Sequence, residues 1–169
     1  FDKLVGLGQH PKEIADTVTL LERIGHFVDV ENQRLFDLYK QEGLANEVIS
    51  QRIAEEIDMP TILTHAANSL DGGYVMCGMI GHGDAFVMRD PNGIRPAFFY
   101  EDDEVVVITS ERPVIQTAFN VSTEDVHEIK PGHALIIKRD GTVSMPQVKQ
   151  PSERKACSFE RIYFSRGND

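Results

Sequence analysis

The spacing of apolar residues changes near Asp71-Gly72-Gly73, and this change constrains the fold more than any other feature of the sequence. Before that point apolar residues recur three and four positions apart, which is the spacing of one face of an α-helix. After it they stand in short runs separated by Gly, Pro, Asn and Asp, as in strands joined by tight turns. The sequence therefore predicts helices followed by mainly antiparallel strands, the α+β class.

The helical part of the sequence predicts four helices. Their apolar stripes fall within residues 14–28, 30–39, 44–57 and 62–70. Gly43 is predicted to end the second helix, because glycine readily adopts the left-handed conformation that commonly follows a helix C-terminus. Pro11 is predicted to lie in the first turn of the first helix, where proline is well suited, and the fourth helix is predicted to come after Pro60.

The remaining residues predict strands and one short helix. Residues 74–80 are apolar at every position except the glycine, which predicts a strand buried on both faces. Residues 97–109 predict a hairpin around an acidic turn, and 133–138 a strand that leads into the turn Asp140-Gly141. Ser110 is predicted to cap a short helix around Ile115, and 159–164 to form a last strand. Doubly buried strands require either two stacked sheets or additional strands.

The charge of the chain limits its partners. There are 17 Lys and Arg residues against 27 Asp and Glu, a formal net charge of −10. An acidic surface disfavours nucleic acid and anionic membranes, and the basic pairs Lys138-Arg139 and Arg154-Lys155 are interpreted as solvated turns. Two cysteines, Cys77 and Cys157, form neither a disulfide framework nor a zinc motif, which favours a cytoplasmic location.

Two polar segments could carry chemistry. In Gly81-His82-Gly83-Asp84 the His and Asp could belong to a nucleophile, base and orienting-acid set, but two glycines favour a plain tight turn. Residues 89–96 read Arg-Asp-Pro-Asn-Gly-Ile-Arg-Pro, a loop stiffened by two prolines. It could be a docking surface, but a structural clasp is favoured, in which Asp90 accepts bonds from nearby backbone and an arginine.

Four segments in this order resemble the signatures of the amidophosphoribosyltransferase family. They are residues 89–96, Ser110-Glu111, the segment 130–134 (Lys-Pro-Gly-His-Ala) and the segment 157–166 (Cys-Ser-Phe-Glu-Arg-Ile-Tyr-Phe-Ser-Arg). The resemblance implies a class II glutamine amidotransferase domain of the N-terminal-nucleophile hydrolase type, a four-layer αββα sandwich. It also implies a parent enzyme that hydrolyses glutamine and transfers the ammonia to phosphoribosyl pyrophosphate, giving 5-phosphoribosylamine in the first step of purine synthesis.

The sequence also departs from the family. It opens with Phe1 instead of the nucleophilic cysteine, and it contains neither the His-Asn-Gly-Asn stretch of the family's oxyanion hole nor the arginine loop that holds the glutamine carboxylate. Residues 1–169 are therefore expected to be an internal part of the glutaminase domain, without its N-terminal strands and without the phosphoribosyltransferase domain. Residues 30–58 match no family element and are interpreted as a helical insertion. The chain contains no family catalytic residue and is expected to be inactive alone.

Two residues match functional positions of the family. Asp16 lies in an Ala-Asp-Thr segment where the family places an aspartate that binds the α-ammonium group of glutamine; a helix N-cap is the alternative. Cys157 matches an iron–sulfur ligand of some members. Because a [4Fe-4S] cluster takes four thiolates, the chain alone is expected to hold no metal. Magnesium, and in some members the cluster, are expected in the full-length enzyme.

Two other functions compete with this interpretation. The glutaminase domain of asparagine synthetase shares an Arg-Asp-x-x-Gly-x-x-Pro loop, but the segment 163–166 (Tyr-Phe-Ser-Arg) argues against it. A catalytically dead binding or regulatory module of the same fold is the other alternative. A sandwich that lacks its first strands leaves an apolar sheet edge and face uncovered, so a homo-oligomer or a poorly soluble monomer is expected.

Overall fold

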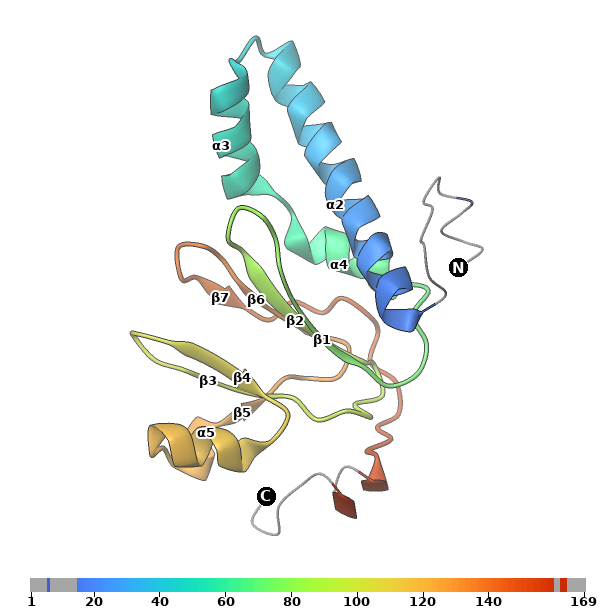
Figure 1. Ribbon diagram of the computed structural model, residues 1–169, viewed down its shortest axis with the longest axis vertical. Helices are drawn as coiled ribbons and strands as arrows, with labels where there is room; N and C mark the ends of the chain where they lie inside the picture. The colour runs from blue at the N-terminus through green and yellow to red at the C-terminus, as the bar shows by residue number, and fades with distance from the viewer. Residues whose placement is uncertain (1–5, 7–14, 160–161, 164–169) are drawn as a thin grey trace. The chain divides into compact units, whose positions relative to one another are not determined.

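The computed structural model describes residues 6, 15–159 and 162–163. The chain forms two compact units, Phe1–Leu70 and Asp71–Asp169. In the described residues the first unit contains helices, and the second contains two antiparallel sheets and a further helix (Figure 1). The change from helices to strands therefore occurs where the periodicity of the sequence changes.

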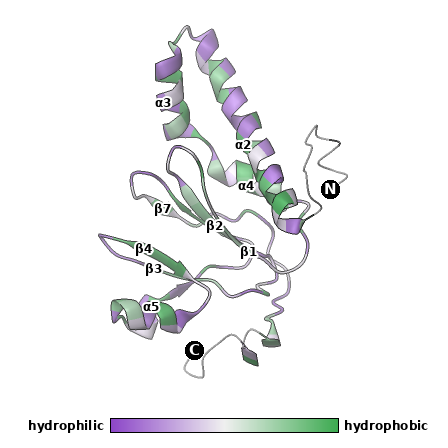
Figure 2. Cartoon of the chain, in the orientation of Figure 1, coloured by the Kyte–Doolittle hydropathy of each residue, from purple (hydrophilic) through white to green (hydrophobic). Residues whose placement is uncertain are grey.

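Three helices are described in the first unit. They are α2 (Asp16–Gln41), α3 (Asn46–Glu56) and α4 (Met59–Ala67). The two helices predicted over 14–28 and 30–39 are one continuous helix, because Val28-Asp29-Val30 contains no residue that interrupts helical hydrogen bonding. Much of the length of α2 is hydrophilic (Figure 2). Among the described residues, no helix is both long enough and apolar enough to cross a membrane.

Gly43 closes α2 as the sequence predicts. Its φ is +81°, its amide donates to the carbonyl of Lys40 (3.1 Å), and the amide of Leu44 donates to the carbonyl of Tyr39 (3.2 Å). This pair of bonds is the Schellman arrangement, which satisfies carbonyls that the last turn of a helix leaves without partners. The chain thereby reverses into α3.

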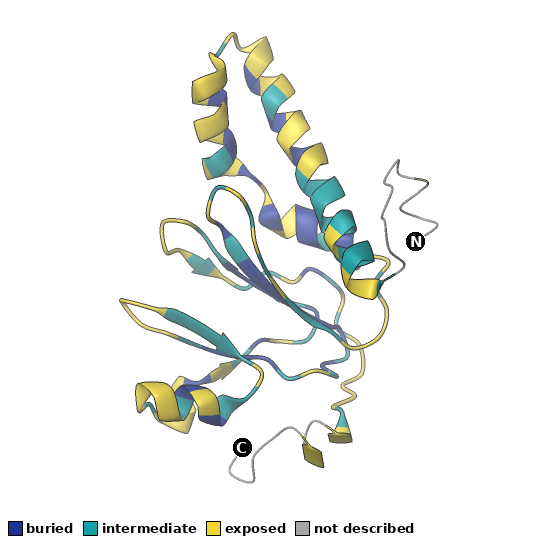
Figure 3. Ribbon diagram, viewed as in Figure 1, coloured by how far each residue is buried: buried dark blue, intermediate teal, exposed yellow. Residues whose placement is uncertain are grey.

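Arg23 joins α2 to the end of α4. Its Nε donates to the carbonyl of Ala66 (2.8 Å) and its Nη2 to that of His65 (3.0 Å), where helix carbonyls lack intrahelical partners. The guanidinium also lies over the ring of Phe27, at 5.3 Å from the centroid. Nearly all of the apolar side chains of α4 are buried (Figure 3), with Asp58 as its N-cap.

The second unit contains two antiparallel sheets. The first sheet has the strand order β1 (Val75–Met79), β2 (Ala85–Arg89), β6 (Ala134–Ile137) and β7 (Val143–Ser144). The second has the order β4 (Val106–Thr109), β3 (Phe98–Glu101) and β5 (His127–Glu128). The helix α5 (Arg112–Phe119) and a short 3₁₀ turn, Thr123–Asp125, connect β4 to β5.

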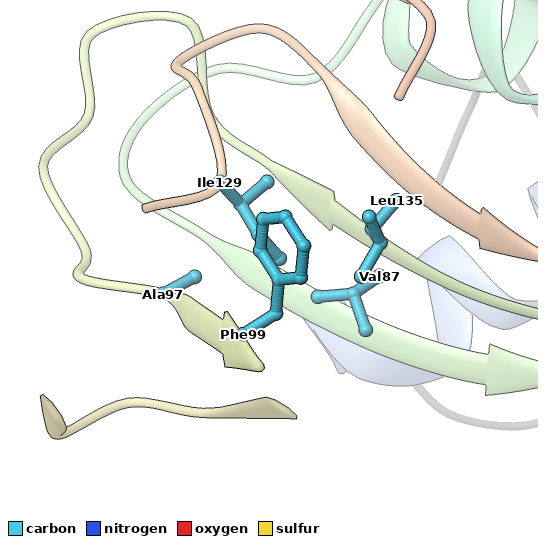
Figure 4. Packing of buried hydrophobic residues seen from close by; sticks show 5 residues of the cluster. All are labelled: Val87, Ala97, Phe99, Ile129 and Leu135. Atoms are coloured by element: carbon cyan, nitrogen blue, oxygen red, sulfur yellow. The ribbon is translucent and has the colours of Figure 1, made fainter. Parts of the chain in front are cut away.

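The two sheets stack on one another. Val87 and Leu135 of the first sheet pack with Phe99 of the second in one buried cluster, together with Ala97 and Ile129 (Figure 4). Phe98 points to the opposite face, where it packs with Ile115 of α5 and with Val126. Adjacent residues of a strand face opposite ways, so Phe98 and Phe99 attach the second sheet to a helix on one face and to a sheet on the other.

The strand predicted to be buried on both faces is a half-buried edge strand, which corrects that prediction. β1 is the edge of the first sheet, Cys77 is exposed, and Met79 is 76% exposed. Of β1, only Val75 packs against the cluster between the sheets. The neighbouring strand β2 is the buried one, because it lies between β1 and β6 and directly over the second sheet.

Two further predictions are wrong in detail. The short helix begins at Arg112 with Glu111 as its N-cap and no side-chain capping bond, so Ser110 does not cap it. The described residues of 159–164 are helical instead of extended. The rings of Phe159 and Tyr163 stack at a centroid distance of 5.6 Å, which suits residues four apart on a helix.

Gly132 and Gly141 differ in how much space surrounds them, although both lie in turns with positive φ. Both have positive φ, +71° and +88°. A Cβ at Gly132 would lie 2.3 Å from the carbonyl oxygen of Lys149, whereas a Cβ at Gly141 would meet nothing. We expect Gly132→Ala to lower the free energy of unfolding by roughly 3 kcal/mol, from left-handed strain plus a backbone clash, and Gly141→Ala by about 1 kcal/mol from strain alone. Urea unfolding of both variants measures this, and equal losses would contradict it.

Candidate functional site: the Asp90 loop and Asp16

The loop after β2 is organised around the buried carboxylate of Asp90. Asp90 is fully buried. Its Oδ1 accepts bonds from the amides of Asn92 and Ile94 (3.0 Å each), and its Oδ2 accepts one from the amide of Arg95 (3.1 Å). These donors replace the water that a carboxylate loses on burial. We call residues 90–95 the Asp90 loop.

The backbone of Asp90 joins this loop to two other segments. Its amide donates to the carbonyl of Tyr74 (2.9 Å), and its carbonyl accepts from the amides of Gly93 (3.2 Å) and Gly132 (3.1 Å). The favoured interpretation of residues 89–96 as a structural clasp is therefore confirmed. The Lys130-Pro131-Gly132 segment meets the Asp90 loop directly, and so does Cys157 through its amide, so three of the four family-like segments meet in the fold.

The buried side chain of Arg89 pairs with an acid of the second sheet. Its side chain is 2% exposed, and it pairs with Glu128 of β5, Nη1 to Oε1 at 2.8 Å, and not with Asp90. Its Nε donates to the carbonyl of Arg95 (2.7 Å) and Nη1 also to that of Ile129 (2.6 Å). Successive side chains of an extended segment point to opposite sides, so Arg89 reaches the second sheet while Asp90 turns into its own loop.

Tyr74 lies beside this cluster but is not suited to acid–base chemistry. Its hydroxyl is buried and has no hydrogen-bond partner among the described residues. Burial, followed by the negative charge of Asp90, raises the pKa of Tyr74 to about 12. A general acid or base works best with a pKa near the working pH, so Tyr74 stays a neutral phenol. The contacts of the Asp90 cluster are those of a structural support.

The turn Gly81-His82-Gly83-Asp84 is also structural. Asp84 is fully buried, pairs with the ammonium of Lys138, and accepts a bond from the amide of Arg139 (2.9 Å). His82 Nε2 lies 3.8 Å from Asp84 Oδ2, too far for the hydrogen bond that would orient a catalytic base. The plain-turn interpretation is confirmed. Lys138, interpreted as part of a solvated turn, instead joins the β1–β2 turn to the β6–β7 turn.

Asp16, the predicted substrate-binding residue, is the first residue of α2 and is exposed. The N-cap is Ala15, which has no side-chain capping bond, so the alternative that Asp16 is the cap is wrong. A carboxylate in the first turn still favours the helix electrostatically. The binding of glutamine by Asp16 stays a prediction.

The two cysteines lie apart from any recognisable ligand set. Both thiols are free. Although Cys77 is exposed as a residue, partial burial of its thiol raises the pKa, which lowers the fraction of reactive thiolate. Cys157 is half-buried, and its amide donates to the carbonyl of Ile94 (3.2 Å). Within residues 15–159, no three His, Cys, Asp or Glu side chains are grouped as metal ligands would be.

Sequence reasoning missed Glu128 as a member of this region. Glu128 lies 39 residues after Arg89, and no local pattern links two residues at that separation. A weak signal does exist, because Glu128 comes two residues before the family-like segment at Lys130. The antiparallel pairing of β3 with β5 is what brings it to Arg89.

The substitution Asp90→Asn tests the clasp. An amide would offer one acceptor oxygen and would point N–H groups at a backbone amide, so buried donors would lose their partners. We expect a loss of roughly 2–4 kcal/mol in the free energy of unfolding. The matched control is Asp102→Asn, because Asp102 accepts similar bonds from the amides of Glu104 and Val105 but is exposed. Equal shifts of the urea midpoint in the two variants would be inconsistent with the central role of Asp90.

No family model matches the chain. Individual proteins do match it. The chain is 31% identical over 140 residues to an amidophosphoribosyltransferase of Archaeoglobus fulgidus, and the aligned region covers 82% of this chain and 29% of that protein. It is 33% identical over 102 residues to one of Lachancea kluyveri, covering 56% of this chain and 20% of that protein.

A solved structure is similar to the whole chain. Glutamine phosphoribosylpyrophosphate amidotransferase of B. subtilis matches with a TM-score of 0.59 and 25% identity, covering 99% of this chain and 30% of that one. The chain thus spans less than a third of the length of these relatives. Over most of its own length, the chain is related to a part of the amidophosphoribosyltransferases.

Proposed function

We propose that this chain is a part of the glutamine-hydrolysing half of an amidophosphoribosyltransferase. The whole enzyme would hydrolyse glutamine and transfer the ammonia to phosphoribosyl pyrophosphate, giving 5-phosphoribosylamine for purine synthesis. The observation that carries the proposal is the 31% identity over 140 residues to such an enzyme. The structural similarity over 99% of the chain supports it independently of the aligned residues.

The fold supports the glutaminase half in particular. An N-terminal-nucleophile sandwich needs two antiparallel sheets stacked face to face, with helices outside them. The cluster of Val87, Phe99 and Leu135 joins two such sheets, and α5 covers the outer face of one of them. In this proposal residues 30–58, which form the second half of α2 and all of α3, are an insertion into the domain.

Asp16 is proposed to bind the α-ammonium group of glutamine. Its carboxylate lies at the exposed start of α2, where a ligand can approach it. A carboxylate and an ammonium form a charge-assisted hydrogen bond, which is stronger than one between neutral groups. Asp16 would therefore select an amino acid over a simple amide.

Metal groups are proposed only for the full-length enzyme. The transferase reaction is expected to use magnesium, and some members of the family carry an iron–sulfur cluster. Cys157 supplies one thiolate where such a cluster takes four, so this chain's residues cannot hold the cluster by themselves. Association into a homo-oligomer also stays a prediction.

The chain alone is predicted to release no ammonia from glutamine. Its two thiols are the only candidates for a cysteine nucleophile, and the raised pKa of the Cys77 thiol opposes its activation. A coupled ammonia assay on the purified chain measures this. Ammonia release that disappears in Cys77→Ala or Cys157→Ala would contradict the prediction.

The substitution Asp16→Asn in the full-length enzyme tests the binding role. Without the carboxylate the ammonium group of the substrate loses its charged partner, so glutamine-dependent turnover at low glutamine should fall by roughly 10- to 100-fold. Synthesis from free ammonia should persist, because the transferase reaction does not involve this residue.

Glu47→Gln is the matched control for this experiment. Glu47 is an exposed acid in the first turn of α3, so its loss affects helix electrostatics in the same way without a proposed ligand. This variant should use glutamine normally. Normal glutamine use by Asp16→Asn as well would leave Asp16 with an electrostatic role in the helix only.

A further inference from the structure

A short segment near the end of the described chain runs along the Asp90 loop and bonds to it through the backbone. The amide of Ser152 donates to the carbonyl of Pro91 (2.8 Å), and that of Lys155 to the carbonyl of Asn92 (2.8 Å). Cys157 makes the equivalent bond to Ile94. In the other direction, Asn92 Nδ2 donates to the carbonyl of Glu153 (3.0 Å). We call residues 152–157 the strap.

Burial of apolar side chains contributes little to holding the strap in place. Residues 152–156 are exposed and Cys157 is half-buried. The segment reads Ser-Glu-Arg-Lys-Ala-Cys, with no large apolar side chain. Hydrogen bonds at a surface add only modest net stability, because water can replace them.

One ion pair fastens the middle of the strap. Arg154 Nη2 lies 2.7 Å from Glu128 Oε1, and the same oxygen accepts from Arg89 Nη1 at 2.8 Å. The Arg154 side chain is 56% exposed, while that of Arg89 is 2% exposed. Glu128 therefore has one permanent buried partner and one exposed partner that solvent can replace.

The Asp90 loop does not need the strap for its own hydrogen bonds. The Asp90 carboxylate is satisfied by amides within the loop. Arg89 keeps Glu128 and the carbonyls of Arg95 and Ile129 when Arg154 leaves. Release of the strap therefore leaves no buried charge unpaired, and the carbonyls that it uncovers become open to water. An element that can leave at such low cost is suited to two states.

We propose that the strap is a releasable element that docks on a preformed Asp90 loop, with the Arg154–Glu128 pair as its latch. In the docked state the loop fixes the direction in which the chain continues beyond Cys157. In the released state the clasp stays folded while residues 152–157 separate from it. This inference does not depend on the proposed function, because it rests only on contacts within Asp71–Asp169.

Amide hydrogen exchange of the full 169-residue chain, measured by NMR, tests the proposal. The strap reporters are the amides of Ser152, Lys155 and Cys157, and the loop reporters are those of Asn92, Ile94 and Arg95. In Arg154→Gln the strap amides should exchange about two- to fivefold faster, the range expected for loss of an exposed ion pair. The loop amides should keep their rates.

Arg52→Gln is the matched control. Arg52 is 55% exposed and pairs with Glu56 at 3.2 Å in the helical unit, so it removes a comparable ion pair away from the strap. This variant should leave the strap amides unchanged. Raising NaCl from about 0.05 M to 1 M should accelerate strap exchange in the parent and control chains but not in Arg154→Gln, because salt screens an exposed pair.

A second variant, Asn92→Ala, removes a strap bond without touching the latch or the backbone amides that bind Asp90. It should also accelerate hydrogen exchange at the strap amides and leave exchange at the loop amides unchanged. Unchanged strap exchange in Arg154→Gln would overturn the latch. Equal acceleration of strap and loop amides in either variant would overturn independent release, because the two segments would then open as one unit.

Discussion

The second unit of this protein depends on a carboxylate that has been removed from water. Asp90 is fully buried, and the amides that solvate it come from the turn that follows it. A buried charge without such donors would neutralise itself or unfold its surroundings. Its backbone in turn holds Tyr74 and Gly132, so the ends of three segments are fixed at one residue.

Arg89 extends this support from one sheet to the other. It ends β2 of the first sheet, and its ion pair is with Glu128 of β5 in the second. The apolar cluster of Val87, Phe99 and Leu135 stabilises the stacking of the two sheets, but the hydrophobic effect is not directional. The ion pair of Arg89 and its bonds to carbonyl groups are directional, so they fix the position of one sheet relative to the other. Glu128 therefore serves both contacts: it pairs with Arg89 between the stacked sheets and with Arg154 in the docked strap.

The segments that resemble amidophosphoribosyltransferase signatures have structural roles in the part of the chain that the structure describes. Residues 89–95 build the clasp, and Gly132 packs its backbone against that clasp and against Lys149. Asp16, the proposed contact to substrate, belongs to the other unit. A segment that resembles a family signature can therefore have a structural role instead of a catalytic or binding one. Here the proline-stiffened loop is a scaffold, whereas the proposed binding residue lies in only a short motif.

The sequence by itself determined what depends on neighbours along the chain. The switch from helix to strand near Asp71, the left-handed turn at Gly43 and the turn at Asp140-Gly141 all follow from local periodicity and backbone preference. Only the tertiary structure decided which apolar strand is buried and which partner each charge takes. β1 is as apolar as β2, yet it is the sheet edge. Arg89 pairs with Glu128, and Lys138 with Asp84, at separations of 39 and 54 residues, because strand pairing sets those distances and no local pattern records them.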